Sequence, residues 1–311
     1  MAPLTHLLIP AAVGSSDDPR ALVAALPPLP NLKKLLARLA PERTIEIAED
    51  GPATPFELVQ AAALGLPDAP GCTPWAAYET NTFGVPCAFI KLCHWQIGLD
   101  QVQALDPAAL ALTDAESHAL LGSAAPWFAE DGIELSYHRP GVWLAKGDVF
   151  RDLRTISLDR AIGRTVSREL LQSTVGNTGA LGRLQHEMQM LLYDHPTTDA
   201  RLQRRQLAPN AIWIAGAGVL PGAIPPPAGL QIENCLSIAA AQRNLPVFAA
   251  AWSALDAGAI ARLAAQKDAR LTLAGERCAI TFATPAGGWA ARFASRWLQS
   301  RVTPASILER L

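Results

Sequence analysis

Charged residues are scarce in this sequence of 311 residues, of which Asp, Glu, Lys and Arg make up only 17%. The formal net charge is −2, so no strong field of one sign points to nucleic acid or an anionic membrane as a partner. Proline or charge interrupts the apolar stretches before they reach the roughly 20 residues that a membrane-spanning helix needs. The first residues also lack the basic segment of a secretory signal. We therefore expect a cytoplasmic protein that binds neither nucleic acid nor membrane.

Cysteine, histidine and serine are missing where several kinds of site would need them. The five cysteines are an odd number without a CxxC pair, which is typical of reduced thiols rather than of disulfides or a zinc site. There are six histidines, and none follows His195. No serine occurs between residues 51 and 100. The last third of the chain therefore offers no imidazole ligand for a metal, and residues 51–100 offer no serine nucleophile.

Segments with the pattern of a strand follow segments with the pattern of a helix along the chain. The strand-like segments are either continuously apolar or alternate between apolar and polar residues. Strands are predicted at 4–12, 44–49, within 86–105, at 132–146 as a hairpin, and at 210–218, 246–252, 269–275 and 277–283. Helices are predicted at 31–40, 55–65, 113–130, 181–193, 257–266 and 287–301. This order predicts an α/β fold. We expect residues 1–85 plus 181–311 to form its core, with 86–180 as an inserted α+β subdomain that includes a mobile connection.

Two of these helices carry a signature at their first residues. Thr54 is followed by Pro55, which suits a helix that begins with a capping residue and then proline. Thr113 and Glu116 have the spacing of a capping box, in which each side chain bonds the backbone of the other. The starts of these two helices are therefore specific predictions.

The most specific pattern lies in residues 184–218, LQHEMQMLLYDHPTTDARLQRRQLAPNAIWIAGAG. His195, Pro196, Arg201, Pro209, Asn210, Ile212, Trp213, Gly216 and Gly218 match, in order and spacing, a pattern of the cofactor-independent phosphoglycerate mutases. The chain resembles this family over roughly residues 85–245, and the Glu-Met run at 187–190 is similar to its bacterial branch of RpfE-type regulatory proteins. The resemblance implies a three-layer, alkaline-phosphatase-like sheet, here reduced.

The same resemblance implies chemistry for which residues are missing. The family uses two divalent metals, held by Asp and His, beside a serine that is phosphorylated. Its first metal-binding Asp follows the first strand, where this chain has Ile9, Pro10, Ala11 and Ala12. We therefore predict a catalytically degenerate, regulatory or ligand-binding protein without metal or cofactor. An active metal-dependent mutase or phosphatase, and a structural protein that binds only a partner, remain open alternatives.

Six residues of the motif are candidates for binding a small phosphorylated or carboxylated metabolite: Arg201, Asn210, His195, Thr198, Gly216 and Gly218. A guanidinium binds phosphate through two parallel hydrogen bonds, which makes Arg201 the leading candidate. Thr198 replaces an asparagine of the family pattern, which weakens any contact made there.

Each candidate also has a structural interpretation. Arg201 could pair with Asp194 or Asp199, and His195 could end the preceding helix beside its C-terminal dipole. Asn210 could bond the backbone of its turn, and the glycines could permit a tight turn. The glycines also suggest dinucleotide binding, but prolines follow them where that motif needs a helix.

Overall fold

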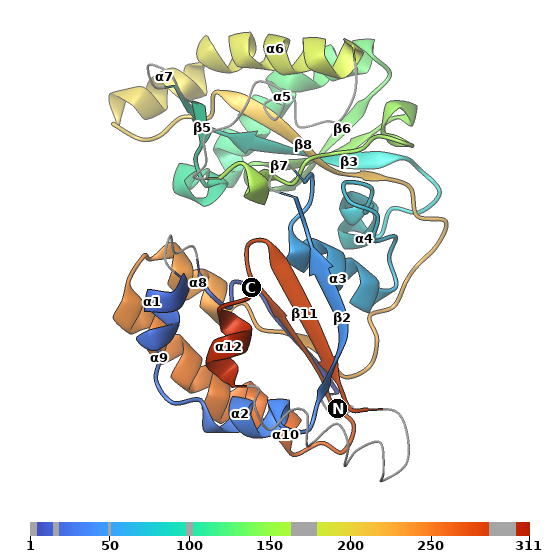
Figure 1. The fold of residues 1–311 in the computed structure, drawn as a ribbon. Helices are drawn as coiled ribbons and strands as arrows, with labels where there is room; N and C mark the ends of the chain where they lie inside the picture. Colours follow the sequence, from blue (N-terminus) through green and yellow to red (C-terminus); the bar gives the residue numbers. More distant parts are fainter. Residues whose placement is uncertain (1–4, 15–18, 49–50, 98–101, 163–178, 286–302) are drawn as a thin grey trace. The chain divides into compact units, whose positions relative to one another are not determined.

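The computed structural model describes residues 5–14, 19–48, 51–97, 102–162, 179–285 and 303–311 (Figure 1). The chain divides into two compact units. Unit 1 consists of residues 1–50, 54–65 and 225–311, and unit 2 of residues 51–53 and 66–224.

The boundaries of the two units differ from those of the sequence prediction, which placed residues 66–85 and 181–224 in the core. These residues belong to unit 2 because strand β8 (Ala211–Gly218) pairs with β3 (Cys87–Cys93). Pairing between segments so distant in the sequence is not visible in local patterns.

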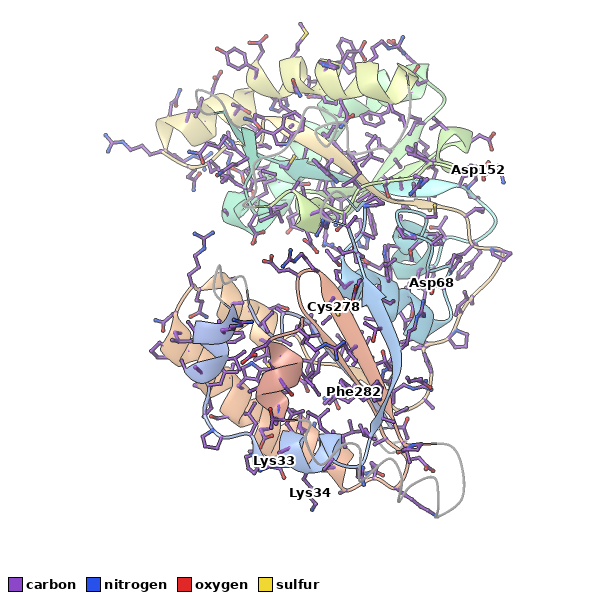
Figure 2. The ribbon with its side chains drawn as sticks, viewed as in Figure 1. Lys33, Lys34, Asp68, Asp152, Cys278 and Phe282 are labelled. Carbon is purple, nitrogen blue, oxygen red and sulfur yellow. The ribbon has the colours of Figure 1, made fainter. Side chains whose placement is uncertain are left out.

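Unit 1 contains a mixed five-stranded sheet in the order β2-β11-β10-β1-β9. Its strands are β1 (His6–Ile9), β2 (Ala40–Glu46), β9 (Leu230–Ile232), β10 (Arg270–Ala274) and β11 (Cys278–Ala283). Strand β1 is parallel to both neighbours, while β11 is antiparallel to both β10 and β2. Alternate residues of β11, including Cys278 and Phe282, enter the main core of the unit (Figure 2).

Six described helices of unit 1 bury apolar residues in this core. They are α1 (Pro19–Ala24), α2 (Pro30–Leu36), α8 (Cys235–Ala241), α9 (Leu245–Leu255), α10 (Ala261–Ala264) and α12 (Pro304–Leu308). A further helix, α3 (Pro55–Leu64), buries Val59 in a smaller cluster with Ala274 and Ala279. In α2, Leu32, Leu35 and Leu36 are buried, whereas Lys33 and Lys34 are exposed (Figure 2). Helix α3 packs on strands of the sheet, and the predicted cap at Thr54 is confirmed. Thr54 also forms a capping box with Glu57, which the sequence analysis did not predict.

The prediction of a strand at 246–252 is wrong, because these residues lie within α9. Asn244 caps this helix by accepting a hydrogen bond from the backbone of Val247 at 3.3 Å. Phe248 and Trp252, four residues apart, are buried on its inner face. A π-helical turn (Asp256–Ile260) continues α9 into α10, and the stretch Leu245–Ala264 is long and apolar enough to span a membrane. Its buried side chains belong to the core of unit 1.

Unit 2 contains a four-stranded antiparallel sheet in the order β6-β7-β3-β8. The outer strand β6 (Glu134–Arg139) and its inner neighbour β7 (Val142–Lys146) form the predicted hairpin. A separate two-stranded ladder joins β4 (Trp95–Ile97) and β5 (Val102–Ala104). The mixture of helices and strands in the two units confirms the predicted α/β class.

Helices α5 (Asp114–Glu130) and α6 (Gly179–Tyr193) cover one face of the four-stranded sheet. The other described helices of unit 2 are α4 (Trp75–Thr80), which contacts β3 and β8, and α7 (Pro196–Gln203), which contacts α5. The 3-10 turns are η1 (Pro107–Leu110), η2 (Asp148–Phe150) and η3 (Leu158–Arg160). Ile90 of β3, Trp143 of β7 and Ile212 of β8 share one core with α5 and α6. The predicted capping box of α5 is confirmed, whereas α4 lies in a segment predicted as loop. The predicted helix at 287–301 lies outside the described residues.

Candidate functional site

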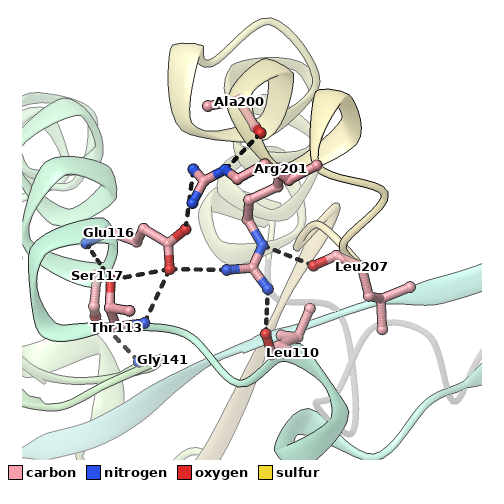
Figure 3. Close-up of polar contacts among 9 residues, drawn as sticks. Leu110, Thr113, Glu116, Ser117, Gly141, Ala200, Arg201 and Leu207 are labelled. Atoms are coloured by element: carbon pink, nitrogen blue, oxygen red, sulfur yellow. Dashed lines mark hydrogen bonds and ion pairs between the residues drawn. The ribbon is translucent and has the colours of Figure 1, made fainter.

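Arg201 lies on α7 with its side chain buried and fully engaged (Figure 3). Its Nε donates to the carbonyl of Leu207 at 2.8 Å, and one terminal nitrogen donates to Glu116 at 2.8 Å. The other terminal nitrogen donates to the carbonyl of Leu110. The partner of Arg201 is thus Glu116 of α5, and neither of the aspartates suggested by the sequence. A guanidinium with each nitrogen already bonded to protein has little left for a ligand.

Glu116 is the anion at the centre of this network. Burial by itself raises the pKa of Glu116, but hydrogen bonds from Thr113 and Arg201, together with the charge of Arg201, lower it below its usual value. The carboxylate is therefore ionised at neutral pH. It caps α5 and ties α5 to α7 with the same pair of oxygens.

His195 and Thr198 join the end of α6 to the start of α7. The Nδ1 atom of His195 accepts a hydrogen bond from the backbone of Thr197 at 3.1 Å, so His195 caps α7 and does not end α6. Its other nitrogen must then carry the proton, and it lies 3.0 Å from the hydroxyl of Ser123. Burial lowers the pKa of His195, which keeps this neutral tautomer. Because Nε2 donates, it is not placed to take a proton from Ser123. Thr198 donates from its hydroxyl to the carbonyl of Leu192 at 2.7 Å.

Asn210 directly precedes β8, and the two glycines lie at its C-terminal end. Asn210 exchanges two hydrogen bonds, at 2.7 and 2.9 Å, with the backbone of Trp95. A Cβ on Gly216 would lie 2.8 Å from the Cβ of Trp75, and a Cβ on Gly218 would lie 2.9 Å from that of Pro74. Both glycines have positive φ, +62° and +144°. They are required because residues 74–76 approach the strand closely, which is a structural role.

The six predicted residues do not meet in one cavity. Asn210 and Gly218 are separated by the length of β8, roughly 25 Å at the rise of an extended chain. His195, Thr198 and Arg201 lie on or beside α7 and bond protein atoms. None of the six lines the cleft described next.

A cleft of about 410 Å³ lies in unit 2 and contains a cation that the sequence analysis did not select. Lys91 occupies the middle of β3, between two strands. It pairs in register with Val142 of β7 and Trp213 of β8, both buried, so its two cross-strand neighbours on that sheet face are apolar. Among the described residues, no hydrogen bond or ion pair engages its ammonium group. A half-buried, unpaired lysine on such a face is a candidate for ligand binding.

A β-bulge places a second cation beside Lys91. The register of β6 shifts between Tyr137 and Arg139, so that Arg139 pairs with Val142. Without the shift, Arg139 would share the face of Tyr137 and point toward the core formed with α5 and α6. With it, the guanidinium lies 5.9 Å from the centre of the Phe89 ring, on the face of Lys91. Lys91 and Arg139 thus flank Val142 in one row, with Cα atoms roughly 10 Å apart.

The hydrogen-bond network around Arg201 holds residues that line this cleft. Leu110, whose carbonyl accepts from Arg201, lines the cleft. Gly141, also in the lining, donates to the hydroxyl of the buried Ser117 at 3.1 Å. Figure 3 shows both contacts beside Glu116. Arg201 therefore positions the cleft without entering it.

The thiols of β3 do not provide a nucleophile. Burial raises the pKa of Cys87 to about 11 and that of Cys93 to about 12. Both thiols are therefore protonated and poorly reactive at neutral pH. Among the residues that the structure describes, no group of three or more His, Cys, Asp and Glu side chains could hold a metal ion.

One signal in the sequence could have revealed Lys91. The run PCAFIKLCHW contains a single charge within a strand that is otherwise apolar. A charge at the centre of a buried strand requires either a partner or solvent. The role of Arg139 could not have been found in this way, because it depends on the bulge.

A comparison with solved structures finds chains that are distantly similar to this one. The cofactor-independent phosphoglycerate mutase from Thermoplasma acidophilum DSM 1728 is 14% identical, with 99% of this chain and 98% of that chain covered and a TM-score of 0.38. The PH0037 protein from Pyrococcus horikoshii is 13% identical, with 91% and 88% covered and a TM-score of 0.39. No family model matches the chain, and neither does any curated protein. Likeness at this level says nothing about activity.

Proposed function

We propose that this chain is a catalytically degenerate, phosphoglycerate-mutase-like protein that binds a small phosphorylated or carboxylated metabolite in the cleft of unit 2. Its role is regulatory, of the RpfE type, and it acts in the cytoplasm. The observation that carries the proposal is the row formed by Lys91, Val142 and Arg139, which presents two cations to one cleft. The absence of the family's metal-binding residues from the sequence supports a binding role over catalysis.

The two cations are free to bind an anion to different degrees. Lys91 has no ion pair among the described residues, so its charge is available. Arg139 lies 3.6 Å from Glu79, and both side chains are about half exposed, at 51% and 43%. Such exposed pairs contribute only about 0–1 kcal/mol, so an anion in the cleft can displace Glu79. Lys91 is therefore the principal anchor.

Isothermal titration calorimetry of the full chain with 3-phosphoglycerate and with inorganic phosphate tests the proposal. We expect binding, and we expect Lys91→Met to weaken it at least ~10-fold, because a hydrogen bond to a charged group contributes about 1.5–3 kcal/mol. Lys146→Met is the matched control, since Lys146 lies on β7 outside the cleft. Its affinity should equal that of the unaltered protein.

Two results would contradict the proposal in different ways. Turnover of 3-phosphoglycerate with two equivalents of bound manganese or zinc would show an active enzyme. No binding of any phosphorylated or carboxylated compound by the folded protein would favour a structural or partner-binding role.

A further inference from the structure

The cleft also has an acidic wall, which the binding of a simple anion does not explain. Asp106 precedes η1 and Asp159 lies in η3, and both line the cleft. A parallel bridge between Ala104 and Ile162 brings these two segments together. The acids therefore come from neighbouring segments of one wall, whereas the cations come from the four-stranded sheet.

Both carboxylates keep the capacity to accept a hydrogen bond. One oxygen of Asp106 accepts from the backbone of Ala108 at 2.8 Å, which leaves its other oxygen. For Asp159, no hydrogen bond or ion pair is found within the described part of the chain. Both side chains are exposed.

The formal charges in the lining cancel, since it contains the two cations Lys91 and Arg139 and the two anions Asp106 and Asp159. A dianion would be attracted by Lys91 and Arg139 but repelled by the two aspartates. A simple amine would be attracted by the aspartates but repelled by the two cations. A molecule with a carboxylate at one end and an ammonium at the other satisfies both walls. The remaining lining is largely apolar, with Leu110, Leu158 and Ile162 among its residues.

Resting on the proposed function, we infer that the metabolite bound in this cleft is a zwitterion of the free α-amino acid class with an apolar side chain. Its carboxylate pairs with Lys91 and Arg139, and its ammonium group pairs with Asp159 and Asp106. Its side chain lies against the apolar residues of η1 and η3. The volume of about 410 Å³ is at the small end of the range for ligand cavities, which suits a molecule of this size.

A matched set of three ligands tests the inference by calorimetry on the full chain. Leucine carries both charged groups, 4-methylpentanoate lacks the amine, and isoamylamine lacks the carboxylate. We expect leucine to bind at least ~10-fold more tightly than either. Asp159→Asn should weaken leucine at least ~10-fold, because the ammonium group loses its partner. It should leave 4-methylpentanoate binding as tightly or more tightly, because an anion is no longer repelled. The fold should not change, because the Asp159 side chain caps no helix. Asp148→Asn, outside the cleft, is the control and should change neither affinity.

The outcomes separate this inference from the proposed function. If 4-methylpentanoate or 3-phosphoglycerate binds as tightly as leucine and Asp159→Asn has no effect, the zwitterion is excluded while the anion site stands. If Lys91→Met weakens leucine and 4-methylpentanoate alike, the carboxylate contact is supported. If no compound of either class binds, the inference and the proposed function both fail.

Discussion

Arg201 and Lys91 are both partly or fully buried cations of unit 2, but their surroundings are opposite. Each nitrogen of Arg201 donates to a protein oxygen, and its charge is met by Glu116. Lys91 stands on an apolar sheet face and opens into a cleft without an ion pair among the described residues. The contrast shows that residue type and burial do not identify a binding cation. What decides is whether the protein itself has already satisfied the charge.

The largest expected effect is on stability when Arg201 is removed. Arg201→Met leaves Glu116 as a buried carboxylate without its cation and two carbonyls without a donor. Breaking such a buried pair costs about 3–5 kcal/mol, and we expect a loss of that size in urea denaturation. Arg204→Met is the control, because Arg204 is exposed and lies 3.8 Å from the same carboxylate. It should change stability by less than about 0.5 kcal/mol. If the Arg201→Met protein is stable but no longer binds ligand, Arg201 is a ligand-binding cation and not a structural one.

The second prediction concerns Gly216, which the sequence suggested as part of a ligand site. Gly216→Ala should destabilise the protein by roughly 2–3 kcal/mol, because φ is +62° and the added Cβ would lie 2.8 Å from Trp75. Gly222→Ala is the matched control, since no atom lies within 4 Å of the Cβ it would add. Thermal denaturation should separate the two variants. Equal stability would show that residues 74–76 can move away, and would return Gly216 to the list of ligand residues.

Much of the local structure could be predicted from the sequence, because it depends on neighbouring residues. Two helix starts were found, at Thr54 and Thr113, each of which bonds a glutamate three residues later. The hairpin at 132–146 followed from its alternation and its Pro-Gly turn. The strand predicted at 246–252 failed for a related reason. A short, continuous apolar run fits a buried strand as well as a buried helix, and periodicity alone cannot distinguish them.

The candidate site could not be predicted, because its properties depend on distant pairs. Arg201 is satisfied by a glutamate 85 residues away in the sequence. Gly216 is required because of Trp75, and Arg139 reaches the cleft because a bulge shifts the register of β6. Motif matching selects positions in a sequence, but it cannot show which donors the fold has already used.

A third prediction uses pH to compare the two units. Burial, and next the charge of Arg270, lower the pKa of His6 from 6.5 to about 4. The unfolded chain therefore takes up a proton between pH 6.5 and 4 that folded unit 1 does not, so stability falls as pH falls through this window. Amide hydrogen exchange in β1 and β10, corrected for intrinsic rates, should show this loss of protection. His6→Gln should reduce the pH dependence, whereas His186→Gln, on the exposed side of α6, should not. An unchanged slope in His6→Gln would assign the effect to other groups.

The smallest effect on stability should come from Lys91, and it completes the contrast with Arg201. Lys91→Met removes a charge from an apolar face and keeps a side chain of similar length, while no hydrogen bond or ion pair from the described residues is lost. We expect the free energy of unfolding to change by less than about 0.5 kcal/mol, or to rise, in urea denaturation beside Lys146→Met. If the variant retains its stability but no longer binds ligand, the unpaired Lys91 serves binding and not folding. A loss above about 2 kcal/mol would instead make Lys91 a structural residue, and the cleft would lose the cation on which its proposed function depends.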